Sequence, residues 1–194
     1  MIEVRIHGRG GQGAVIASKV LADAAFREGR FVQSFPLFGV ERRGAPVAAF
    51  TRVDEQPVTL RCQIYKPDHV MVLDASLMQS VDVTAGLRPG GWILINTVHP
   101  PDSFSLPRFR VATVDASGVA IRHRLGPRTS PIVNTAILGA FSRVTGIVSL
   151  DAVAAAVRAA VPTKPDANVA ATREAFDLVV MSLSPALDLS THAA

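Results

Sequence analysis

The chain has 194 residues, which is long enough for one domain of ordinary size and short for two. Apolar residues make up 48% and charged residues 19% of the composition, which excludes a disordered or fibrous protein. With a single cysteine, Cys62, the chain alone cannot form an internal disulfide, a cysteine-ligated zinc site or an iron–sulfur cluster.

The distribution of charge and hydropathy argues against a membrane or a nucleic acid as partner. No run approaches the roughly 18 apolar residues of a membrane span, and the N-terminus lacks the apolar core of a signal peptide. We therefore expect a cytoplasmic protein. The 20 basic residues exceed the 16 acidic ones, but the arginines are scattered, without the basic stripe or stacked aromatic residues of a nucleic-acid-binding surface.

The first part of the chain predicts the beginning of an open α/β sheet. Apolar and polar residues alternate over residues 2–7, which predicts a strand with one buried face and with His7 on its polar, surface side. A glycine-rich segment follows at 8–13, then a run of helix formers at 14–26 and a short strand at 31–35. Strand, glycine loop, helix and strand in this order are typical of α/β folds.

Two β-prone runs, 47–53 and 58–64, are joined by a polar turn that contains Pro57, which predicts an antiparallel hairpin and hence a mixed sheet. Cys62 lies in the second run and is expected to be a small core residue. Ser149 is expected to cap a helix that follows it. The remaining predicted elements are strands at 69–74, 92–96 and 110–114 and helices at 76–85, 116–124, 132–144, 150–160 and 169–183.

These elements predict one α/β domain over residues 1–184. The expected architecture has three layers around an open, mixed and mostly parallel sheet, with a Rossmann-like opening and an antiparallel hairpin. Residues 185–194 contain a proline and small polar residues, and we expect them to form a flexible C-terminal tail.

The glycine-rich segment is the first candidate binding site. Gly8, Gly10 and Gly13 match the pattern G-x-G-x-x-G between a strand and a helix, where backbone amides at the helix N-terminus favour an anion. A dinucleotide site also needs an acidic residue at the end of the second strand, and residues 32–35 contain none, which disfavours NAD. Three interpretations of the segment remain open: a tight turn that only allows close packing, a site for another anionic ligand, and a surface that contacts a partner.

The second candidate is the segment around Arg42 and Arg43. These adjacent arginines follow Glu41 between glycines, so one guanidinium can pair with the glutamate and leave the other for a phosphate or carboxylate. A solvated charged turn explains the pattern equally well.

Other polar residues have weaker assignments. Asp74 and Asn96 end predicted strands, where ligands gather in open α/β sheets, but capping of the following turn is favoured over contact with a ligand or partner. Asn134 at a predicted helix start is expected to be a cap rather than a ligand contact. The histidines lack the spacing of metal ligands, and no catalytic set such as Ser-His-Asp is present, so we predict neither a metal site nor catalytic residues.

Two segments together carry a family resemblance. Gly8-Arg9-Gly10-Gly11-Gln12-Gly13, followed by Phe38-Gly39-x-Glu41-Arg42-Arg43-Gly44-Ala45-Pro46-Val47, resembles the gamma subunit of pyruvate and other 2-oxoacid:ferredoxin (flavodoxin) oxidoreductases. The resemblance extends from Val4 to about Val180. Further matching segments are Lys66-Pro67-Asp68 before the strand ending in Asp74, Gly90-Gly91 before the strand ending in Asn96, Asn134-Thr135, Leu138-Gly139-Ala140 and Thr145-Gly146.

The resemblance implies one subunit of an enzyme that oxidises pyruvate or a related 2-oxoacid with coenzyme A and passes electrons to ferredoxin. It places thiamine diphosphate, Mg²⁺ and iron–sulfur clusters on alpha, beta and delta-type partner subunits, and associates the gamma chain with coenzyme A. The candidate coenzyme-binding residues form two clusters, Gly8, Arg9, Gly10, Gly11, Gln12 and Gly13 in the glycine-rich segment and the pair Arg42 and Arg43. One cluster is expected to bind the coenzyme phosphates and the other to dock on partner subunits, and which does which is left open.

Two alternatives remain. The chain can belong to a relative that uses a branched-chain, aromatic or oxalate substrate, because the residues that bind the oxoacid lie mostly on the thiamine-bearing subunits in this family. An alternative of another class is a stand-alone oxidoreductase with its own NAD(P), against which the missing acidic residue argues.

Overall fold

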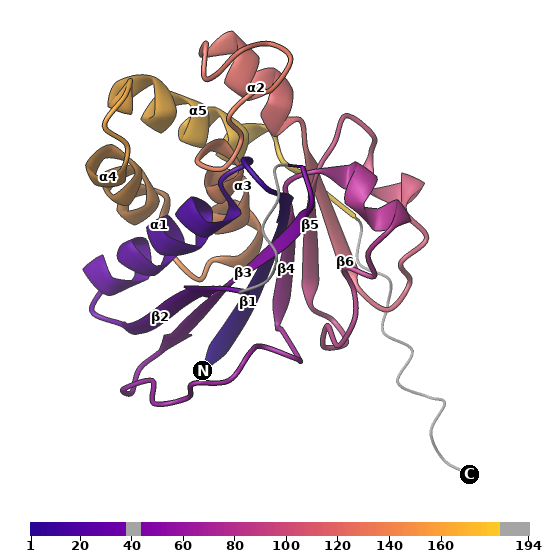
Figure 1. Ribbon diagram of the computed structural model, residues 1–194, viewed down its shortest axis with the longest axis vertical. Helices are drawn as coiled ribbons and strands as arrows, with labels where there is room; N and C mark the ends of the chain where they lie inside the picture. Colours follow the sequence, from indigo (N-terminus) through magenta and orange to yellow (C-terminus); the bar gives the residue numbers. More distant parts are fainter. Residues whose placement is uncertain (38–43, 183–194) are drawn as a thin grey trace.

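The computed structural model describes residues 1–37 and 44–182. The described residues form one seven-stranded sheet, five α-helices and two short 3₁₀ helices (Figure 1). In chain order the elements are β1 (Ile2–Arg9), α1 (Ala14–Arg27), β2 (Phe31–Pro36), β3 (Pro46–Asp54), β4 (His69–Val72), η1 (Ala75–Gln79), β5 (Trp92–Asn96), η2 (Pro101–Ser103), β6 (Arg110–Val114), α2 (Ala116–Arg122), α3 (Ala136–Thr145), α4 (Leu150–Ala160), α5 (Pro165–Leu178) and β7 (Val180–Met181).

The strands lie in the order β2-β3-β1-β4-β5-β6-β7. β1, β4, β5 and β6 pair in parallel, whereas β3 is antiparallel to both β1 and β2, and β7 is antiparallel to β6. The prediction of a single α/β domain with an open, mixed, mostly parallel sheet is confirmed. The predicted tail, 185–194, lies outside the described residues, and the boundary at residue 184 stays a prediction.

The predicted hairpin is wrong. β3 pairs with β1 along one edge and with β2 along the other, so neither edge is left for residues 58–64. Those residues form no strand; they cross the sheet as a loop. Cys62 is exposed in this loop rather than buried in a core.

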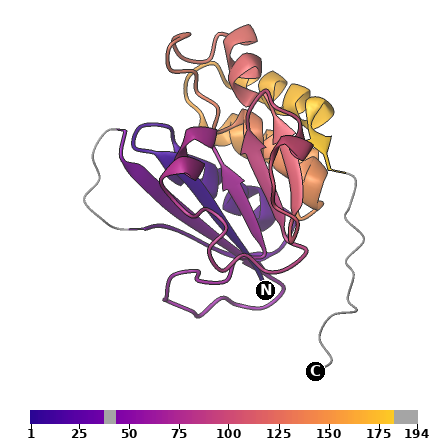
Figure 2. The same cartoon turned by 90° about the vertical axis from the view of Figure 1, so that its right-hand side faces the viewer.

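Helices cover one face of the sheet, and side chains from both layers form the main core (Figures 1 and 2). Val4, Ile6 and Leu94 from the strands and Ile137 and Phe141 from α3 have no exposed surface. Burial of this kind contributes roughly 25 cal/mol for each Å² of apolar surface removed from water, and it holds the helical layer in place.

Three predicted helices differ in extent. Residues 76–85 form only η1 and turns, because the Asp82 carboxylate accepts hydrogen bonds from the backbone and side chain of Thr84 and competes with helical bonding. The helix predicted at 132–144 begins at Ala136, and the one predicted at 169–183 runs from Pro165 to Leu178 before β7. The helix at 150–160 is confirmed, with Ser149 Oγ accepting from Ala152 N.

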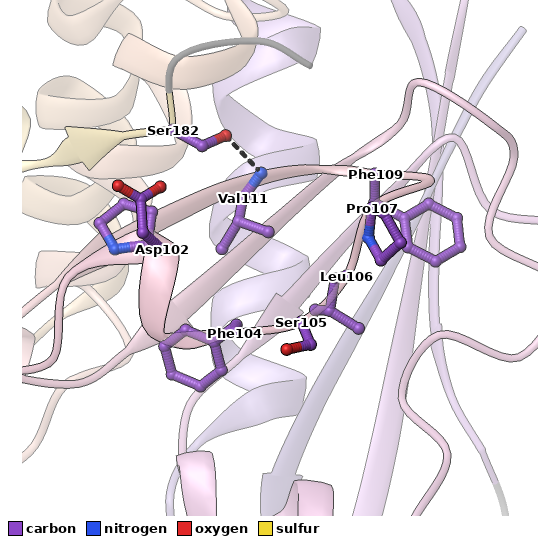
Figure 3. Close-up of a pocket in the computed structure, with 9 residues that line it drawn as sticks. Asp102, Phe104, Ser105, Leu106, Pro107, Phe109, Val111 and Ser182 are labelled. Carbon is purple, nitrogen blue, oxygen red and sulfur yellow. Dashed lines mark hydrogen bonds between the residues drawn. The ribbon is translucent and has the colours of Figure 1, made fainter. Parts of the chain in front are cut away.

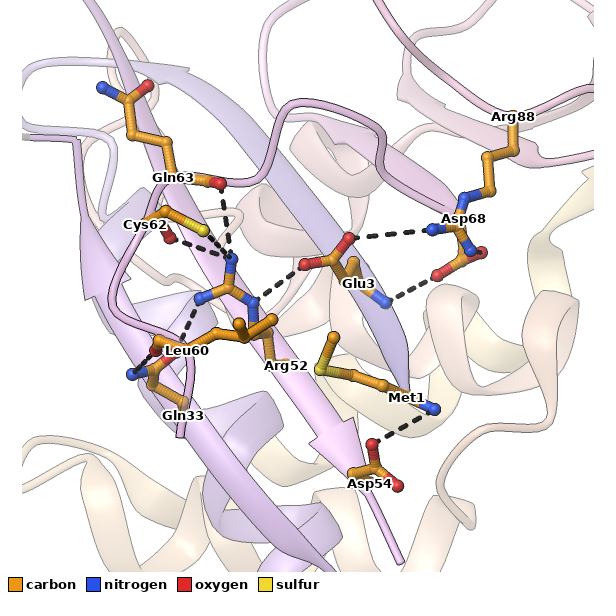
Figure 4. Close-up of polar contacts among 10 residues, drawn as sticks. All are labelled: Met1, Glu3, Gln33, Arg52, Asp54, Leu60, Cys62, Gln63, Asp68 and Arg88. Carbon is orange, nitrogen blue, oxygen red and sulfur yellow. Dashed lines mark hydrogen bonds and ion pairs between the residues drawn. The ribbon is translucent and has the colours of Figure 1, made fainter. Parts of the chain in front are cut away.

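The opposite face carries η1, η2 and loops instead of α-helices, and this irregular covering forms the third layer. A buried arginine holds part of it, as Figure 4 shows. Arg52 on β3 is 1% exposed; it donates from Nε to Glu3 Oε1 at 2.8 Å and from Nη2 to the carbonyl of Cys62 at 2.8 Å. Its Nη1 donates to Gln33 Oε1 at 2.7 Å, and its guanidinium lies over the Phe35 ring. The Arg52 guanidinium thus joins three strands, β1, β2 and β3, to the 58–64 loop.

Across residues 1–37 and 44–182, no helix has the length and apolar character needed to cross a membrane.

Candidate functional site

The carboxyl ends of β1, β4 and β5 meet at one edge of the sheet, where a cavity of about 350 Å³ opens between the glycine loop (residues 8–13) and the loop that precedes α3. Ligands of open α/β sheets bind at this edge. The lining is mostly polar and consists of Gln12, Leu73, Asp74, Ala75, Ser76, Asn96, Ser117, Thr129, Ser130, Pro131 and Val133.

The structure brings the six predicted residues of the glycine loop to this edge. Gly8 and Arg9 end β1, and Gly10 extends its pairing through hydrogen bonds with Gly44 and Ala45. Gly11 turns the chain with a φ of 95°, in the left-handed region that favours glycine. A Cβ at this position would meet no atom of the described residues within 4 Å.

Gln12 and Arg9 fix the shape of the loop. Gln12 Oε1 accepts from Arg9 N at 2.7 Å, and Gln12 Nε2 donates to Asp74 at 3.2 Å. Arg9 donates from Nε to Asp74 at 2.9 Å, from Nη1 to the Gly44 carbonyl and from Nη2 to Ser76 Oγ. All three guanidinium nitrogens of Arg9 therefore have protein acceptors, and Arg9 holds the loop in place rather than offering a free cation.

Asp74 is the ionisable residue of the cavity lining. Burial works to raise its pKa, but hydrogen bonds from Ser76, Gln12 and Arg9 outweigh burial and keep the pKa below its ordinary value. Asp74 is thus a carboxylate at neutral pH and is already paired. It caps η1, by accepting from Ser76 N, and it also lines the cavity, whereas its contact with a ligand or partner stays a prediction.

The other polar groups of the lining are neutral. Asn96 donates from Nδ2 to the Leu73 carbonyl and to Ser117 Oγ, and its Oδ1 accepts from Ser117 N. Hydroxyls of Ser76, Thr129 and Ser130 complete the wall. This lining suits hydroxyl and amide groups of a ligand, and it includes no histidine, cysteine or lysine that can act as base or nucleophile.

The first turn of α1 provides the donors for an anion. Among the described residues no side chain caps this turn, and the turn itself contains no acidic residue, so its amides are available to a ligand. The other two predicted site residues, Arg42 and Arg43, lie outside the described residues. Their neighbour Gly44 is bonded to Gly10 and Arg9, as described above.

Asn134 was expected to cap α3 and does not. The N-cap position of α3 is Thr135, without a side-chain hydrogen bond, and the Asn134 amide instead lies against Gly13, with Nδ2 3.4 Å from the Gly13 carbonyl. The two residues are 121 positions apart, and no local pattern in the sequence signals their contact. Asn134 thus joins the glycine loop as a residue that sequence reasoning missed.

A second cavity of about 470 Å³ lies beside β6 on the loop-covered face. Figure 3 shows Phe104, Leu106 and Phe109 around it, with Ser182 Oγ accepting from Val111 N. This lining is mainly apolar and presents no group of donors for a phosphate, so the glycine-loop edge remains the candidate site.

Comparison with known proteins decides the family. Residues 3–178 match the model of the pyruvate ferredoxin/flavodoxin oxidoreductases. The chain belongs to this family. The family resemblance predicted from the glycine loop and the segment at 38–47 is therefore confirmed.

Relatives of this oxidoreductase family match over most of the chain. Pyruvate synthase subunit PorC of Methanocaldococcus jannaschii is 57% identical over 157 residues, which cover 81% of this chain and 84% of the relative. The pyruvate/ketoisovalerate oxidoreductases common subunit gamma of Thermococcus kodakarensis is 50% identical over 93% of this chain and 98% of its own length.

The solved structures agree. The pyruvate oxidoreductase subunit PORC of Thermotoga maritima superposes with a TM-score of 0.78 at 36% identity, covering 93% of this chain and 98% of that one. This chain is accordingly a gamma subunit of the pyruvate/2-oxoacid:ferredoxin oxidoreductase type, one part of a multisubunit oxidoreductase. The alternative of a stand-alone NAD(P) enzyme finds no support in these matches.

Proposed function

We propose that this gamma subunit binds coenzyme A for an enzyme that converts pyruvate, coenzyme A and oxidised ferredoxin to acetyl-CoA, carbon dioxide and reduced ferredoxin. The observation that carries the proposal is the site itself. An uncapped helix N-terminus stands beside a neutral, hydroxyl-rich cavity, and the acid in its lining, Asp74, is already paired. Such a site binds a phosphorylated, polar co-substrate and leaves bond making to other chains.

The chemistry of coenzyme A fits these residues. Its phosphates suit the amides at the start of α1 and the side of Gly11 that no described residue covers. Its hydroxyl and amide groups suit the cavity wall of Asn96, Ser117 and Ser130. Arg9 and Asp74 act on the coenzyme indirectly, because their ion pair fixes the loop that presents the amides.

We assign the remaining cofactors to alpha, beta and delta-type partner subunits. One cysteine cannot supply the thiolates of an iron–sulfur cluster, and the described residues bring together no group of three His, Cys, Asp or Glu side chains for a metal ion. Thiamine diphosphate with Mg²⁺, which supplies the carbon chemistry when bound, and the clusters that carry electrons therefore belong to other chains. We propose a cytoplasmic location for the subunit, since coenzyme A and ferredoxin are found there.

The proposal is tested on the assembled enzyme purified through a tag on this chain. We expect partner chains rich in cluster-type cysteines to co-purify, and pyruvate oxidation to require added coenzyme A. A full chain that stays monomeric in its host, or that turns over a substrate unaided, would contradict the proposal.

Arg43 offers a residue-level test of the second cluster. If Arg42 and Arg43 bind the coenzyme phosphates, Arg43→Ala should raise the KM for coenzyme A about tenfold, the usual effect of losing a charge-assisted hydrogen bond. If they dock on the thiamine-bearing subunits, the same change should weaken assembly, measured by size-exclusion chromatography. An unchanged KM together with unchanged assembly would remove Arg43 from the site, and Arg61→Ala in the exposed 58–64 loop is the matched control.

A second candidate substrate is a branched-chain 2-oxoacid. The Thermococcus kodakarensis relative is named as a subunit common to pyruvate and ketoisovalerate oxidoreductases, which supports a gamma chain shared between two enzymes. Identification of the co-purifying chains, followed by assays with pyruvate and 2-ketoisovalerate, separates one enzyme from two.

A further inference from the structure

The contact between Gly13 and Asn134 joins two distant parts of the chain at the start of α1. Gly13 has a φ of 81°, and a Cβ at this position would clash with Nδ2 of Asn134. Glycine is therefore needed here both for the backbone conformation and to admit the amide of Asn134. Their chain neighbours Gln12 and Val133 line the cavity, so the contact lies directly behind the cavity wall.

Buried hydrogen bonds from α5 hold Asn134 in this position. Thr135 Oγ1 donates to Asn168 Oδ1 at 2.8 Å, and Thr172 Oγ1 donates to the Thr135 carbonyl at 3.1 Å. Asn168 Nδ2 in turn donates to the carbonyl of Lys164, the residue before α5. The backbone at Thr135 is thereby fixed, and the Asn134 side chain is directed to the glycine loop.

Asn134 is 4% exposed, yet its Oδ1 has no hydrogen-bond partner among the residues that the structure describes. The opposite orientation of the amide would not repair this, because it would place Oδ1 against the carbonyl oxygen of Gly13. A buried acceptor without a donor is costly and needs an explanation. Beside it stands the first turn of α1, whose amides have no side-chain cap. The site thus combines an acceptor that lacks a donor with donors that lack an acceptor.

We propose that Asn134 Oδ1 accepts a hydrogen bond from a ribose hydroxyl of the coenzyme while the neighbouring phosphate binds the amides of α1. This inference rests on the proposed coenzyme A function and specifies which part of the coenzyme this site takes. Because the acceptor and the amides are adjacent, the ligand must carry a hydroxyl directly beside a phosphate. In coenzyme A only the ribose does so, with its 2′-hydroxyl next to the 3′-phosphate.

The first experiment uses the wild-type full chain and two nucleotides that differ by one hydroxyl. Binding of adenosine 3′,5′-bisphosphate and of its 2′-deoxy form is measured by calorimetry, together with coenzyme A itself. We expect the ribo form to bind about tenfold more tightly, the value of one hydrogen bond to a buried acceptor. Equal affinities would overturn the assignment of Asn134.

The second experiment repeats these titrations with Asn134→Leu, which keeps the approximate shape and removes both polar atoms. We expect the preference for the ribo form to disappear. The melting temperature should stay equal or rise, because the unpaired acceptor is gone. Gln56→Leu, an exposed amide beyond the end of β3, is the matched control and should keep the preference. A preference that survives in Asn134→Leu would overturn the proposal.

The outcomes also separate the two proposals. If the wild-type chain binds coenzyme A without distinguishing the two nucleotides, the role of Asn134 fails and the coenzyme function stands. If neither the chain nor the assembled enzyme binds coenzyme A, both fail. Should Asn134→Leu not fold, the comparison of the two nucleotides on the wild-type chain decides the question alone.

Discussion

The two faces of β1 are both buried, but by different means. Val4 and Ile6 point to the helices and have no exposed surface, within an apolar core. Glu3, Arg5 and His7 point to the opposite face, where loops cover them, and each is less than a tenth exposed. The helical face is held by apolar burial, whereas the loop face depends on ion pairs and hydrogen bonds that fail when one partner is lost.

The loop face shows the consequences of this second kind of burial. Arg5 donates from Nη2 to the carbonyls of Val83 and Ala85. Within residues 1–37 and 44–182, neither Nε of Arg5 nor Nε2 of His7 has a hydrogen-bond partner. Burial lowers the pKa of His7 to about 4, with a further contribution from the nearby Arg5 charge and an opposing one from Asp82. A polar face of this kind is sensitive to changes in the charge of its own buried side chains.

The largest loss of stability is expected from a substitution of Arg52 on the loop-covered face. Arg52→Ala leaves the Glu3 carboxylate buried without its main partner and releases the Cys62 carbonyl. Removal of one member of a buried ion pair costs about 3–5 kcal/mol, so we expect the free energy of unfolding, measured with urea, to fall by that amount. Arg61→Ala, an exposed arginine of the same loop, should change it by less than about 0.5 kcal/mol.

A double variant sharpens this result. Arg52→Met combined with Glu3→Leu removes both charges and keeps apolar volume, so it should be less destabilised than Arg52→Ala alone. If the double variant is as unstable as the single one, the loop face depends on more than the pairing of charges.

The next effect is the dependence of stability on pH. His7 has a pKa of about 4 in the folded chain, below its ordinary value of 6.5, so between these values the unfolded chain binds more protons. The contribution of His7 is complete above about pH 6.5 and is lost as the pH falls towards 4. This amounts to roughly 3 kcal/mol. Urea unfolding at pH 7 and pH 4.5 measures it.

His69 provides the counterpart on the helical face. Burial lowers its pKa to about 4 as well; its Nδ1 accepts from Trp92 N, and its ring meets Phe141 edge-on. We expect His7→Gln to remove one part of the pH dependence and to leave the part due to His69. A pH profile identical to that of the wild-type chain would contradict the burial of His7.

The smallest effect is expected on the apolar face. Ile6→Val removes one methylene from a fully buried side chain and should cost about 0.5–1.5 kcal/mol, measured with urea at pH 7. The cost should be the same at pH 4.5, because no titrating group is involved. A cost that grows at low pH would show that the two faces of β1 are coupled.

Much of the fold could be predicted because its signals are local. The alternation at 2–7, the apolar runs of β4 and β5 and the Ser149 cap each depend on neighbouring residues, and each corresponds to an observed element. The pairing of β3 could not be predicted this way. A short polar turn with a proline indicated a hairpin with residues 58–64, but the partners of β3 are β1 and β2.

In the candidate site, too, local features could be predicted and long-range contacts could not. The glycine loop could be recognised because six consecutive residues carry its pattern. That Arg9 is already paired with Asp74, 65 positions away, could not be read from that pattern. His7 was expected at the surface because it alternates with apolar residues, and it is buried because a loop from another part of the chain covers it.

The sequence by itself determined the fold class and the place of the glycine loop between a strand and a helix, because alternation, capping and glycine spacing act over a few neighbouring residues. The segments at 8–13 and 38–47 added the resemblance to a family. Only the tertiary structure decided which polar side chains are buried, that Asn134 meets Gly13 and that Arg52 ties a loop to the sheet. These features arise from contacts between segments tens of residues apart, where the free energy depends on what covers a side chain rather than on its neighbours in the chain.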